Sequence, residues 1–433
     1  MKEDREQLYF HFKPLVRIVR GAQRACIYDV TDNEVYVFDG RLAEVLSRSE
    51  RMSLADMVDN ASTGGISKHE ILEGIDQMRS FGLGELISKP SYREDYKEIF
   101  NHDDYGKKGI TRLEKISIQL TNACDLNCFF CNNPDINPIC FPCRRESERT
   151  SHLKIKNVVE LLKDARLFDC QCVRLSGGDP LLWDGDFPSL LEQAVDMGFI
   201  SIEVYTPAVR FPPDLLRRLT LLKSLTWIVP FFGASATEAD ILSRRIGAFT
   251  DSLGNVIDLK NAGARVFVLL PTLEVNRSQI DNMLEVFARL SIPTIVYKTL
   301  DLDNKSKPTS ASKKNGSNPP YSFKKTDMIR IERNIHWNPC WSFSVAINSN
   351  GQIKPCLYSD RLLGITCGQS NLRDVLRSQG LEDLWIISKD KIDICCRCEF
   401  RYGCQDCRVA AEKIRGSLYE KYPFCSYNPF NTT

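Results

Sequence analysis

Two periods of apolar residues run along the chain and predict a mixed α/β protein. Helical spacing recurs between short apolar runs, as in Val158, Val159, Leu161 and Leu162. The strand-like apolar runs are residues 115–120, 172–176, 200–205, 226–231, 265–270 and 294–298. Strands that alternate with helices form parallel sheets covered by helices. We therefore expect six β-α units between residues 113 and 300, arranged as an open or a curled sheet.

The first 95 residues follow a different pattern and predict a separate module, residues 1–95. Apolar residues alternate in 25–30 and in 34–38, with Thr31-Asp32-Asn33 between them, which predicts a hairpin. Helical spacing then appears around residues 42–46, 54–58 and 71–78. Ser67 and Glu70 form a capping box before the last of these helices.

Two polar stretches separate the predicted domains. Residues 96–112 are polar and punctuated by glycine, which is typical of a linker. Residues 301–330 are rich in lysine, serine and proline and predict a flexible linker. Residues 331–433 form the last domain.

Composition excludes several classes of protein. The chain has 433 residues, 43% of them apolar and 26% charged, which is ordinary for a globular protein. Its net charge of +1 gives no general attraction to nucleic acid. We expect no membrane span and a cytoplasmic location, because no apolar run is long enough to cross a bilayer. Seventeen cysteines then favour metal binding, since a reducing compartment disfavours disulfides.

Three cysteines directly after the first apolar run predict an iron–sulfur site. Cys124, Cys128 and Cys131 are spaced C-x3-C-x2-C. Three close thiolates can hold three irons of a four-iron cluster and leave the fourth iron open to another ligand. The alternative is structural zinc, which normally takes four protein ligands.

This spacing resembles the cluster loop of radical S-adenosylmethionine (radical SAM) enzymes. The resemblance implies a [4Fe-4S] cluster on Cys124, Cys128 and Cys131, with SAM on the open iron and Phe130 against the adenine. It also implies one-electron cleavage of SAM to a 5′-deoxyadenosyl radical, an electron donor such as flavodoxin or ferredoxin, and a partial (β/α)6 barrel.

Further residues match SAM-contact positions of the same family. Gly177, Gly178 and Asp179 resemble its Gly-Gly-Glu-Pro motif, with aspartate in place of glutamate. Thr206, Ser235 and Asn276 follow the next strands and resemble other recurrent contacts, although Pro207-Ala208 replaces the usual Asn-Gly after the threonine. Each polar residue could instead cap the end of a strand.

A second field of cysteines lies near the C-terminus. The stretch from Trp341 to Pro355 predicts a hairpin that places Cys340 and Cys356 on neighbouring strands. The field resembles the SPASM extension of peptide maturases. This resemblance implies two auxiliary [4Fe-4S] clusters, whose ligands are Cys395, Cys398, Cys404 and Cys425 in one and Cys340, Cys356 and Cys407 in the other.

The second auxiliary set has three obvious ligands. We expect its fourth iron to be open to a substrate thiolate. Alternatively, Cys367, Cys396 or the Cys140–Cys143 pair completes it. A zinc module is the structural alternative for the whole field.

Residues 1–95 resemble, by the order of their elements, the PqqD-like leader-recognition domain of peptide-modifying enzymes. In that family a leader peptide adds a strand to the edge of the hairpin sheet. A generic winged-helix or dimerisation module is the alternative. The resemblances together imply a maturase that crosslinks a ribosomally made precursor peptide. The alternatives are a sulfatase-type maturase of a protein side chain and an iron–sulfur carrier or scaffold without SAM chemistry.

Overall fold

The computed structural model describes residues 7–90, 112–131, 143, 150–219, 222–298, 328–366 and 371–431, except for residues 15, 30, 31, 33, 47, 50, 63 and 64. These residues fold into two compact units. Unit 1 comprises residues 1–106, 304–342 and 385–433, and unit 2 comprises residues 107–303 and 343–384. The predicted linkers 96–112 and 301–330 lie, except for their last residues, outside the described residues.

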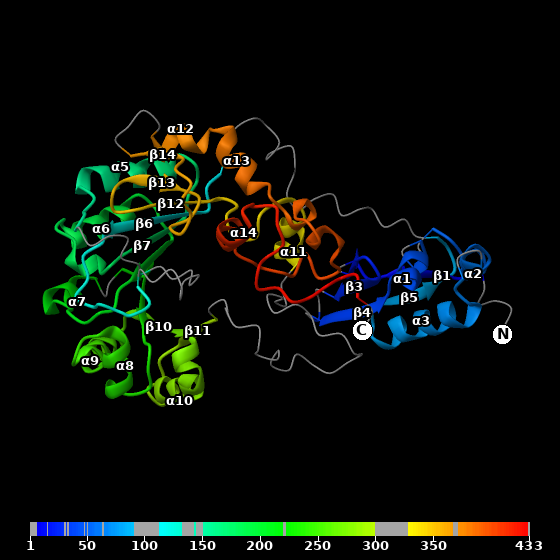
Figure 1. Ribbon diagram of the computed structural model, residues 1–433, viewed down its shortest axis with the longest axis horizontal. Coiled ribbons are helices and arrows are strands. Elements are labelled where there is room, and N and C mark those ends of the chain that lie inside the picture. The colour runs from blue at the N-terminus through cyan, green and yellow to red at the C-terminus, as the bar shows by residue number, and fades with distance from the viewer. Residues whose placement is uncertain are drawn as a thin grey trace. The chain divides into compact units, whose positions relative to one another are not determined.

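Unit 2 is built on a sheet of six neighbouring parallel strands in the order β11-β10-β9-β8-β7-β6 (Figure 1). The strands are β6 (Lys115–Thr121), β7 (Cys172–Gly177), β8 (Ser201–Tyr205), β9 (Leu225–Pro230), β10 (Arg265–Thr272) and β11 (Thr294–Lys298). The six predicted strands are confirmed within one or two residues. Each is strongly apolar because helices cover the sheet.

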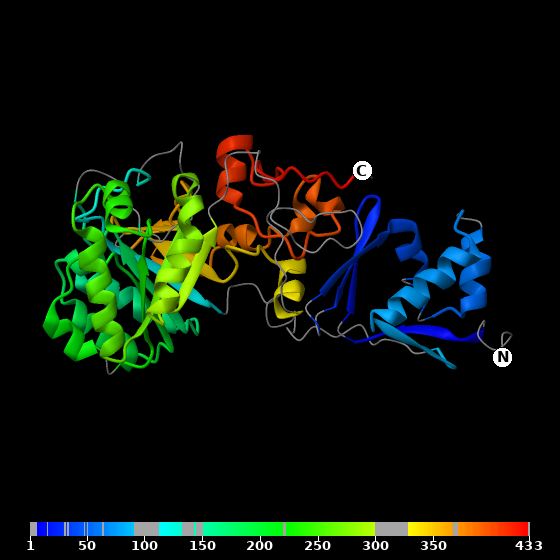
Figure 2. The same cartoon turned by 90° about the horizontal axis from the view of Figure 1, so that it is seen from below.

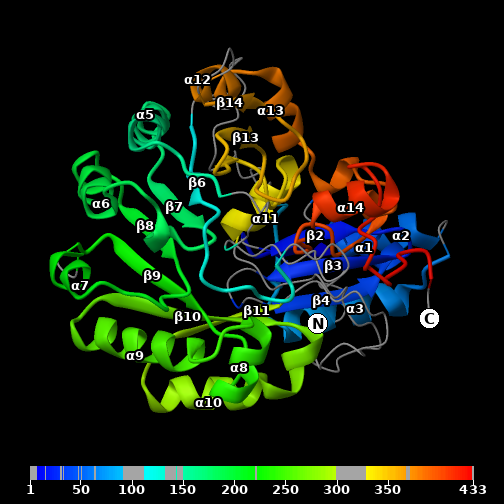
Figure 3. The same ribbon diagram turned by 60° about the vertical axis from the view of Figure 1, so that its left-hand side comes forward.

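Helices that connect these strands lie along the outer face of the sheet (Figure 3). They are α5 (Ile155–Arg166), α6 (Phe187–Asp196), α7 (Pro213–Leu219), α9 (Ala248–Asn261) and α10 (Ile280–Arg289). The short helix α8 (Ala236–Ser243) follows β9 and precedes α9. Val173 and Leu175 on β7 are fully buried, whereas Arg174 between them is partly exposed. Because successive residues of a strand face opposite sides of the sheet, Val173 and Leu175 face the covering helices and Arg174 faces the concave inner side. This is the curled arrangement expected of a partial (β/α)6 barrel.

A second segment of the chain extends the same sheet beyond β6. β12 (Ser344–Ile347) pairs with β6 in parallel, and β13 (Gln352–Lys354) and β14 (Gly364–Ile365) continue the sheet in antiparallel fashion. The hairpin predicted after Trp341 is confirmed. The prediction that Cys340 and Cys356 lie on its neighbouring strands is wrong. Both cysteines lie outside the strands, Cys340 in unit 1 and Cys356 in unit 2.

Two short helices follow this extension. They are α12 (Leu372–Leu376) and α13 (Gln379–Trp385), and Arg373 of α12 bonds Asp164 of α5 at 2.7 Å. The predicted domain 331–433 is therefore divided between the two units.

Unit 1 contains the N-terminal module, residues 7–90. Its strands are β1 (Tyr9–Phe12), β2 (Val16–Arg20), β3 (Arg24–Asp29), β4 (Glu34–Asp39) and β5 (Gly84–Ile87), and its helices are α1 (Gly40–Leu46), α2 (Leu54–Ser62) and α3 (Lys68–Ser80). The predicted β3–β4 hairpin and the three helices are confirmed. So is the capping box, in which Glu70 N–H donates to Ser67 Oγ at 3.2 Å and Ser67 N–H to Glu70 at 2.7 Å.

The sheet β2-β3-β4 packs on both faces. One face meets the helices of the module through Val16, Ile27 and Phe38. The other face packs against α11 (Met328–His336) and against residues 385–431, which we call the cysteine-rich segment (Figure 2). This segment contains α14 (Arg408–Arg415). No helix in the described ranges has the length and apolar character needed to span a bilayer.

Candidate active site

The three cysteines of the C-x3-C-x2-C motif lie on the loop that follows the carboxyl end of β6. Two backbone hydrogen bonds fix this cluster loop, residues 124–131, to the last turn of α8. Asn127 N–H donates to Ser243 O at 3.0 Å, and Phe129 N–H donates to Leu242 O at 3.2 Å. The loop therefore sits at the edge of the sheet where parallel α/β proteins bind ligands.

The Cys128 thiol lies close to the thiols of Cys124 and Cys131. Burial raises the pKa of the Cys128 thiol, and the thiolates of Cys124 and Cys131 raise it further. The Leu126 N–H donates to Cys124 Sγ at 3.4 Å. Within the described part of the chain, no three His, Cys, Asp or Glu side chains gather closely enough to hold a single metal ion. In an iron–sulfur cluster each thiolate binds a different iron, so three close thiols are a suitable donor set for one.

A fourth thiol stands beside this loop. Cys143 Sγ donates to Gly178 O at 3.0 Å. Burial raises the pKa of Cys143, and Cys124, Cys131 and Cys128 add to the effect. Of the residues considered as a replacement ligand, Cys140 and Cys367 lie outside the described residues.

Gly177 and Gly178 bring β7 against the start of the cluster loop. A side chain on Gly177 would place Cβ 2.2 Å from Thr121 O, and one on Gly178 would place it 2.3 Å from Ala123 O. Gly178 N–H and Asp179 N–H donate to these same two carbonyls at 2.9 and 2.7 Å. The space left by the glycines is thus filled by backbone of the loop, and the expected SAM contact of this motif stays a prediction.

We expect Gly178→Ala to lower the thermal unfolding midpoint and the iron content of the reconstituted protein, because its Cβ would overlap Ala123 O. Overpacking of this kind typically costs about 1–3 kcal/mol. Gly254→Ala is the matched control, since that helical glycine has open space around it. The control should gain about 0.5–1 kcal/mol. Equal midpoints for the two variants would contradict the role of Gly178.

Asp179 and Thr206 bond each other below the loop. Thr206 Oγ1 donates to Asp179 Oδ1 at 2.7 Å, and Leu181 N–H donates to the same oxygen at 3.1 Å. Both side chains are almost fully buried. Burial raises the pKa of Asp179 to about 6, although these two hydrogen bonds oppose the rise. The pair holds the ends of β7 and β8 together.

Phe130 belongs to an apolar group at the mouth of the barrel. Its ring lies 4.7 Å from that of Phe232, and the group includes Tyr205, Ile228 and Leu269 from the inner face. Phe130 is 7% exposed. The expected contact between this ring and adenine stays a prediction.

Ser235 and Asn276 are both engaged in local hydrogen bonds. Ser235 caps α8, accepting from Glu238 N–H at 3.4 Å. Asn276, in the 3-10 turn Glu274–Gln279, is fully buried. Its amide donates to Phe232 O and Pro271 O at 2.9 Å and accepts from Leu273 N–H at 2.7 Å. Asn276 thus links the ends of β9 and β10, and its proposed SAM contact remains a prediction.

Arginines that the sequence analysis did not single out hold the acidic residue of the cluster loop. Asp125 pairs with Arg210 at 2.6 Å and with Arg245 at 3.5 Å. Arg245 also lies 3.6 Å from Asp251. Arg210 and Arg245 come from different loops, so no local sequence motif indicates that they contact Asp125.

A charged group on the inner face of β7 and β8 was also missed. Arg174 pairs with Glu203 at 2.8 Å, and Tyr205 OH donates to the same Oε2 atom at 3.1 Å. Next to them, Ser176 Oγ is buried and has no hydrogen-bond partner among the described residues. Alternation along the two strands was the signal that could have revealed this polar strip.

The cysteine-rich segment in unit 1 brings together three of the four predicted ligands of one auxiliary cluster. Burial raises the pKa of Cys395 to about 12, and Cys404 is among the groups that raise it. Burial also raises the pKa of Cys398, with further contributions from Cys404 and Cys395. The thiols of Cys395, Cys398 and Cys404 are therefore neighbours, and this donor set fits a cluster. The fourth predicted ligand, Cys425, stays a prediction.

Three buried charges stand next to these thiols. Asp406 bonds both Lys389 and Arg408, and all three side chains are at most 3% exposed. Burial alone would raise the pKa of Asp406, but Lys389 and Arg408 lower it below its usual value. Cys404 and Cys395 also interact with Lys389. Cationic groups near thiolates favour the charged form that binds metal.

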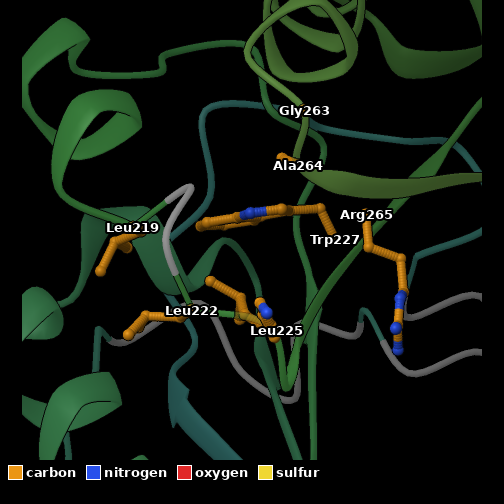
Figure 4. Close-up of a pocket in the computed structure, with 8 residues that line it drawn as sticks. Leu219, Leu222, Leu225, Trp227, Gly263, Ala264 and Arg265 are labelled. Atoms are coloured by element: carbon orange, nitrogen blue, oxygen red, sulfur yellow. The ribbon is translucent and has the colours of Figure 1, made fainter.

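The pocket shown in Figure 4 lies elsewhere in unit 2. It has a volume of about 210 Å³ and lies at the amino ends of β9 and β10, where Leu225, Trp227 and Arg265 line it. The cluster loop follows the carboxyl end of β6, so this pocket belongs to the opposite end of the sheet.

Comparison with known proteins agrees with this geometry. Residues 118–287 match the model of the Radical SAM superfamily, so this part of the chain is a radical SAM domain. Such domains imply a [4Fe-4S] cluster and SAM.

Particular relatives include a maturation protein and a methyltransferase. The chain is 26% identical over 200 residues to the sporulation killing factor maturation protein SkfB of Bacillus subtilis, covering 43% of this chain and 46% of SkfB. It is 26% identical over 183 residues to 7,8-dihydro-6-hydroxymethylpterin dimethyltransferase of Methanocaldococcus jannaschii, covering 40% of this chain and 33% of that enzyme. The chain thus spans 28–46% of the length of the curated relatives it matches.

Solved structures extend the likeness of fold to nearly the whole chain. Streptococcus suis SuiB, solved bound to precursor peptide SuiA, has a TM-score of 0.56 at 15% identity and covers 98% of this chain and 99% of SuiB. Native anSMEcpe with bound AdoMet has a TM-score of 0.52 at 12% identity, and the match covers 71% of this chain and 92% of the anSMEcpe chain. At these identities the likeness shows the fold.

Proposed function

We propose that this protein is a radical SAM maturase that crosslinks a ribosomally made precursor peptide. One observation carries the proposal: three neighbouring thiols lie at the carboxyl end of β6, directly above an inner face with separate polar and apolar parts. SkfB is named as a maturation protein, and SuiB was solved with a precursor peptide, which supports the choice of substrate.

The radical SAM cluster, held by Cys124, Cys128 and Cys131, would supply one electron to SAM and so a radical that abstracts one hydrogen atom from the peptide. Closing the crosslink would release one further electron and a proton, and the auxiliary clusters would accept that electron. The chain's own share is to position the reactants. The glycines Gly177 and Gly178 press the start of the loop against β7, and the Asp179–Thr206 bond fixes the strand ends beneath it.

The inner face suggests how a peptide is held. Arg174, Ser176 and Glu203 offer polar atoms on β7 and β8, whereas Ile228 and Leu269 are apolar on β9 and β10. The bonds from Arg174 and Tyr205 to Glu203 converge on Oε2, which leaves Oε1 to accept a substrate N–H. The main chain of a bound peptide would contact the polar part of the inner face, and one of its apolar side chains would pack against the apolar part.

The N-terminal module supplies a site for the leader. In the sheet β2-β3-β4 the hairpin strand β3 is central, so β4 is the hairpin strand that lies at an edge. An extended leader would add to β4 by main-chain hydrogen bonds. We also propose the domain bounds given above and a second auxiliary cluster. Cys340, Cys356 and Cys407 would hold this cluster, and its fourth iron would be open to a substrate thiolate.

A second reading is a maturase of a protein side chain, which the radical SAM domain also allows. It differs in needing no leader. Removing the leader from the precursor peptide should therefore lower the yield of crosslinked peptide if the first reading holds. An unchanged yield would favour the second.

The decisive experiment incubates the anaerobically reconstituted protein with SAM, reductant and a candidate precursor peptide, taken from any short open reading frame beside its gene, and measures 5′-deoxyadenosine and crosslinked peptide by mass spectrometry. Glu203→Gln should lower the ratio of product to cleaved SAM by about tenfold or more, because a hydrogen bond to a charged group contributes about 1.5–3 kcal/mol. The control Glu192→Gln changes an exposed carboxylate paired with Arg218 on α6 and α7. If the wild-type protein forms no crosslinked peptide, the proposed function is refuted. If Glu203→Gln gives the wild-type ratio of product to cleaved SAM, only the role of Glu203 is refuted.

A further inference from the structure

The N-terminal module and the cysteine-rich segment share a buried boundary within unit 1. Val19, Cys26 and Tyr28 on the sheet pack against Cys398 and Phe400. Ala22 N–H donates to Arg397 O at 2.7 Å, and Arg401 donates to Arg20 O at 2.6 Å. Backbone groups of the two parts are thus bonded directly to one another.

An ion pair lies at the centre of this boundary. Glu399 has a fully buried side chain, and Arg24 Nε on β3 is 3.1 Å from its Oε1. Tyr427 OH donates to Glu399 and accepts from Arg24. The other carboxylate oxygen, Oε2, has no hydrogen-bond partner in the described residues. Arg24 is therefore the cation that balances a buried carboxylate.

The fit around this carboxylate is tight. A Cβ on Gly21 would stand 2.6 Å from Glu399 Oε2 and 2.9 Å from Glu399 N, so the turn between β2 and β3 is shaped to this residue. Tyr28 OH donates to Glu399 O at 3.3 Å and accepts from Gly403 N–H at 3.3 Å. The module holds the stretch that carries two of the neighbouring thiols, Cys398 and Cys404.

We propose that the N-terminal module forms one wall of the iron–sulfur site of Cys395, Cys398 and Cys404, and that Arg24 sets the charge there. This inference rests on the auxiliary cluster proposed above. It gives the module a role in the electron-carrying part of the protein in addition to leader binding.

The direction of the effect follows from electrostatics. Reduction adds a negative charge to a cluster, and the potential depends on neighbouring charges and burial. Glu399 directly follows Cys398, so an unbalanced carboxylate there disfavours reduction. Arg24 offsets this carboxylate. Loss of Arg24 should therefore lower the midpoint potential, and loss of the Glu399 charge should raise it.

The test compares Arg24→Gln, Glu399→Gln, the double variant and Arg24→Lys in the full-length chain. Iron and sulfide are counted, and the midpoint potential of each cluster is followed by redox titration with electron paramagnetic resonance. We expect shifts of opposite sign in the single variants, a potential close to wild type in the double variant and recovery in Arg24→Lys. Arg48→Gln is the control, because Arg48 pairs with Glu44 on the exposed surface of the same module.

The remaining outcomes separate the possible failures. Loss of about four irons in both single variants, with the radical SAM cluster kept, would also support the wall, because the site then fails to assemble. Unchanged potentials and iron, or shifts of equal sign, would overturn the inference. A wild-type protein with only about four irons would refute the auxiliary cluster itself.

Discussion

Replacing Cys124, Cys128 and Cys131 together with alanine is expected to remove about four irons per chain and to abolish reductive cleavage of SAM. The three thiols are neighbours at the end of β6, and without them the open iron has no support. Iron and sulfide analysis with detection of 5′-deoxyadenosine measures both effects. The wild-type protein should hold about twelve irons if both auxiliary clusters form.

Cys170→Ala is the control for this replacement. Cys170 is buried in the same unit, and its thiol donates to Cys172 O at 3.3 Å. The control should retain the iron and the activity. SAM cleavage that survives in the triple variant, or zinc found in place of iron, would contradict the assignment of the cluster loop.

Asp406→Asn is expected to destabilise unit 1 by about 3–5 kcal/mol, because it leaves the buried cations of Lys389 and Arg408 without their counter-ion. Urea unfolding followed by tryptophan fluorescence checks this, with Trp341 and Trp385 as buried reporters in the unit.

An exposed ion pair provides the comparison for Asp406. Glu285 and Arg289 on α10 are both more than half exposed, so Glu285→Gln should change the stability by less than about 1 kcal/mol. If Asp406→Asn is as stable as this control, the buried group contributes little to the fold.

The sequence predicted best what is encoded locally. The strands β6 to β11 are continuous apolar runs, and the capping box of Ser67 and Glu70 is a short motif, so both were read correctly. Pairing between distant segments leaves no local pattern. The addition of β12 to β6 and the packing of β3 on the cysteine-rich segment were therefore missed.

The candidate site divides in the same way. Spacing alone indicated the thiols of the cluster loop. The roles of Thr206 and Asn276 as links between strand ends depend on partners from other strands, namely Asp179 and Phe232. Arg174 and Glu203 meet only through the register of β7 and β8, so a linear reading does not show them as a pair.

The pairing of β12 with β6 also bears on how the protein is made. β6 is complete at Thr121, whereas β12 begins at Ser344, roughly 220 residues later. At about 5–20 residues per second, the ribosome needs on the order of 10 to 50 s to deliver the second strand. During that time the outer edge of β6 carries unpaired backbone groups, which invite association with other chains. Slow or interrupted synthesis should therefore favour aggregation of nascent chains that end before Ser344.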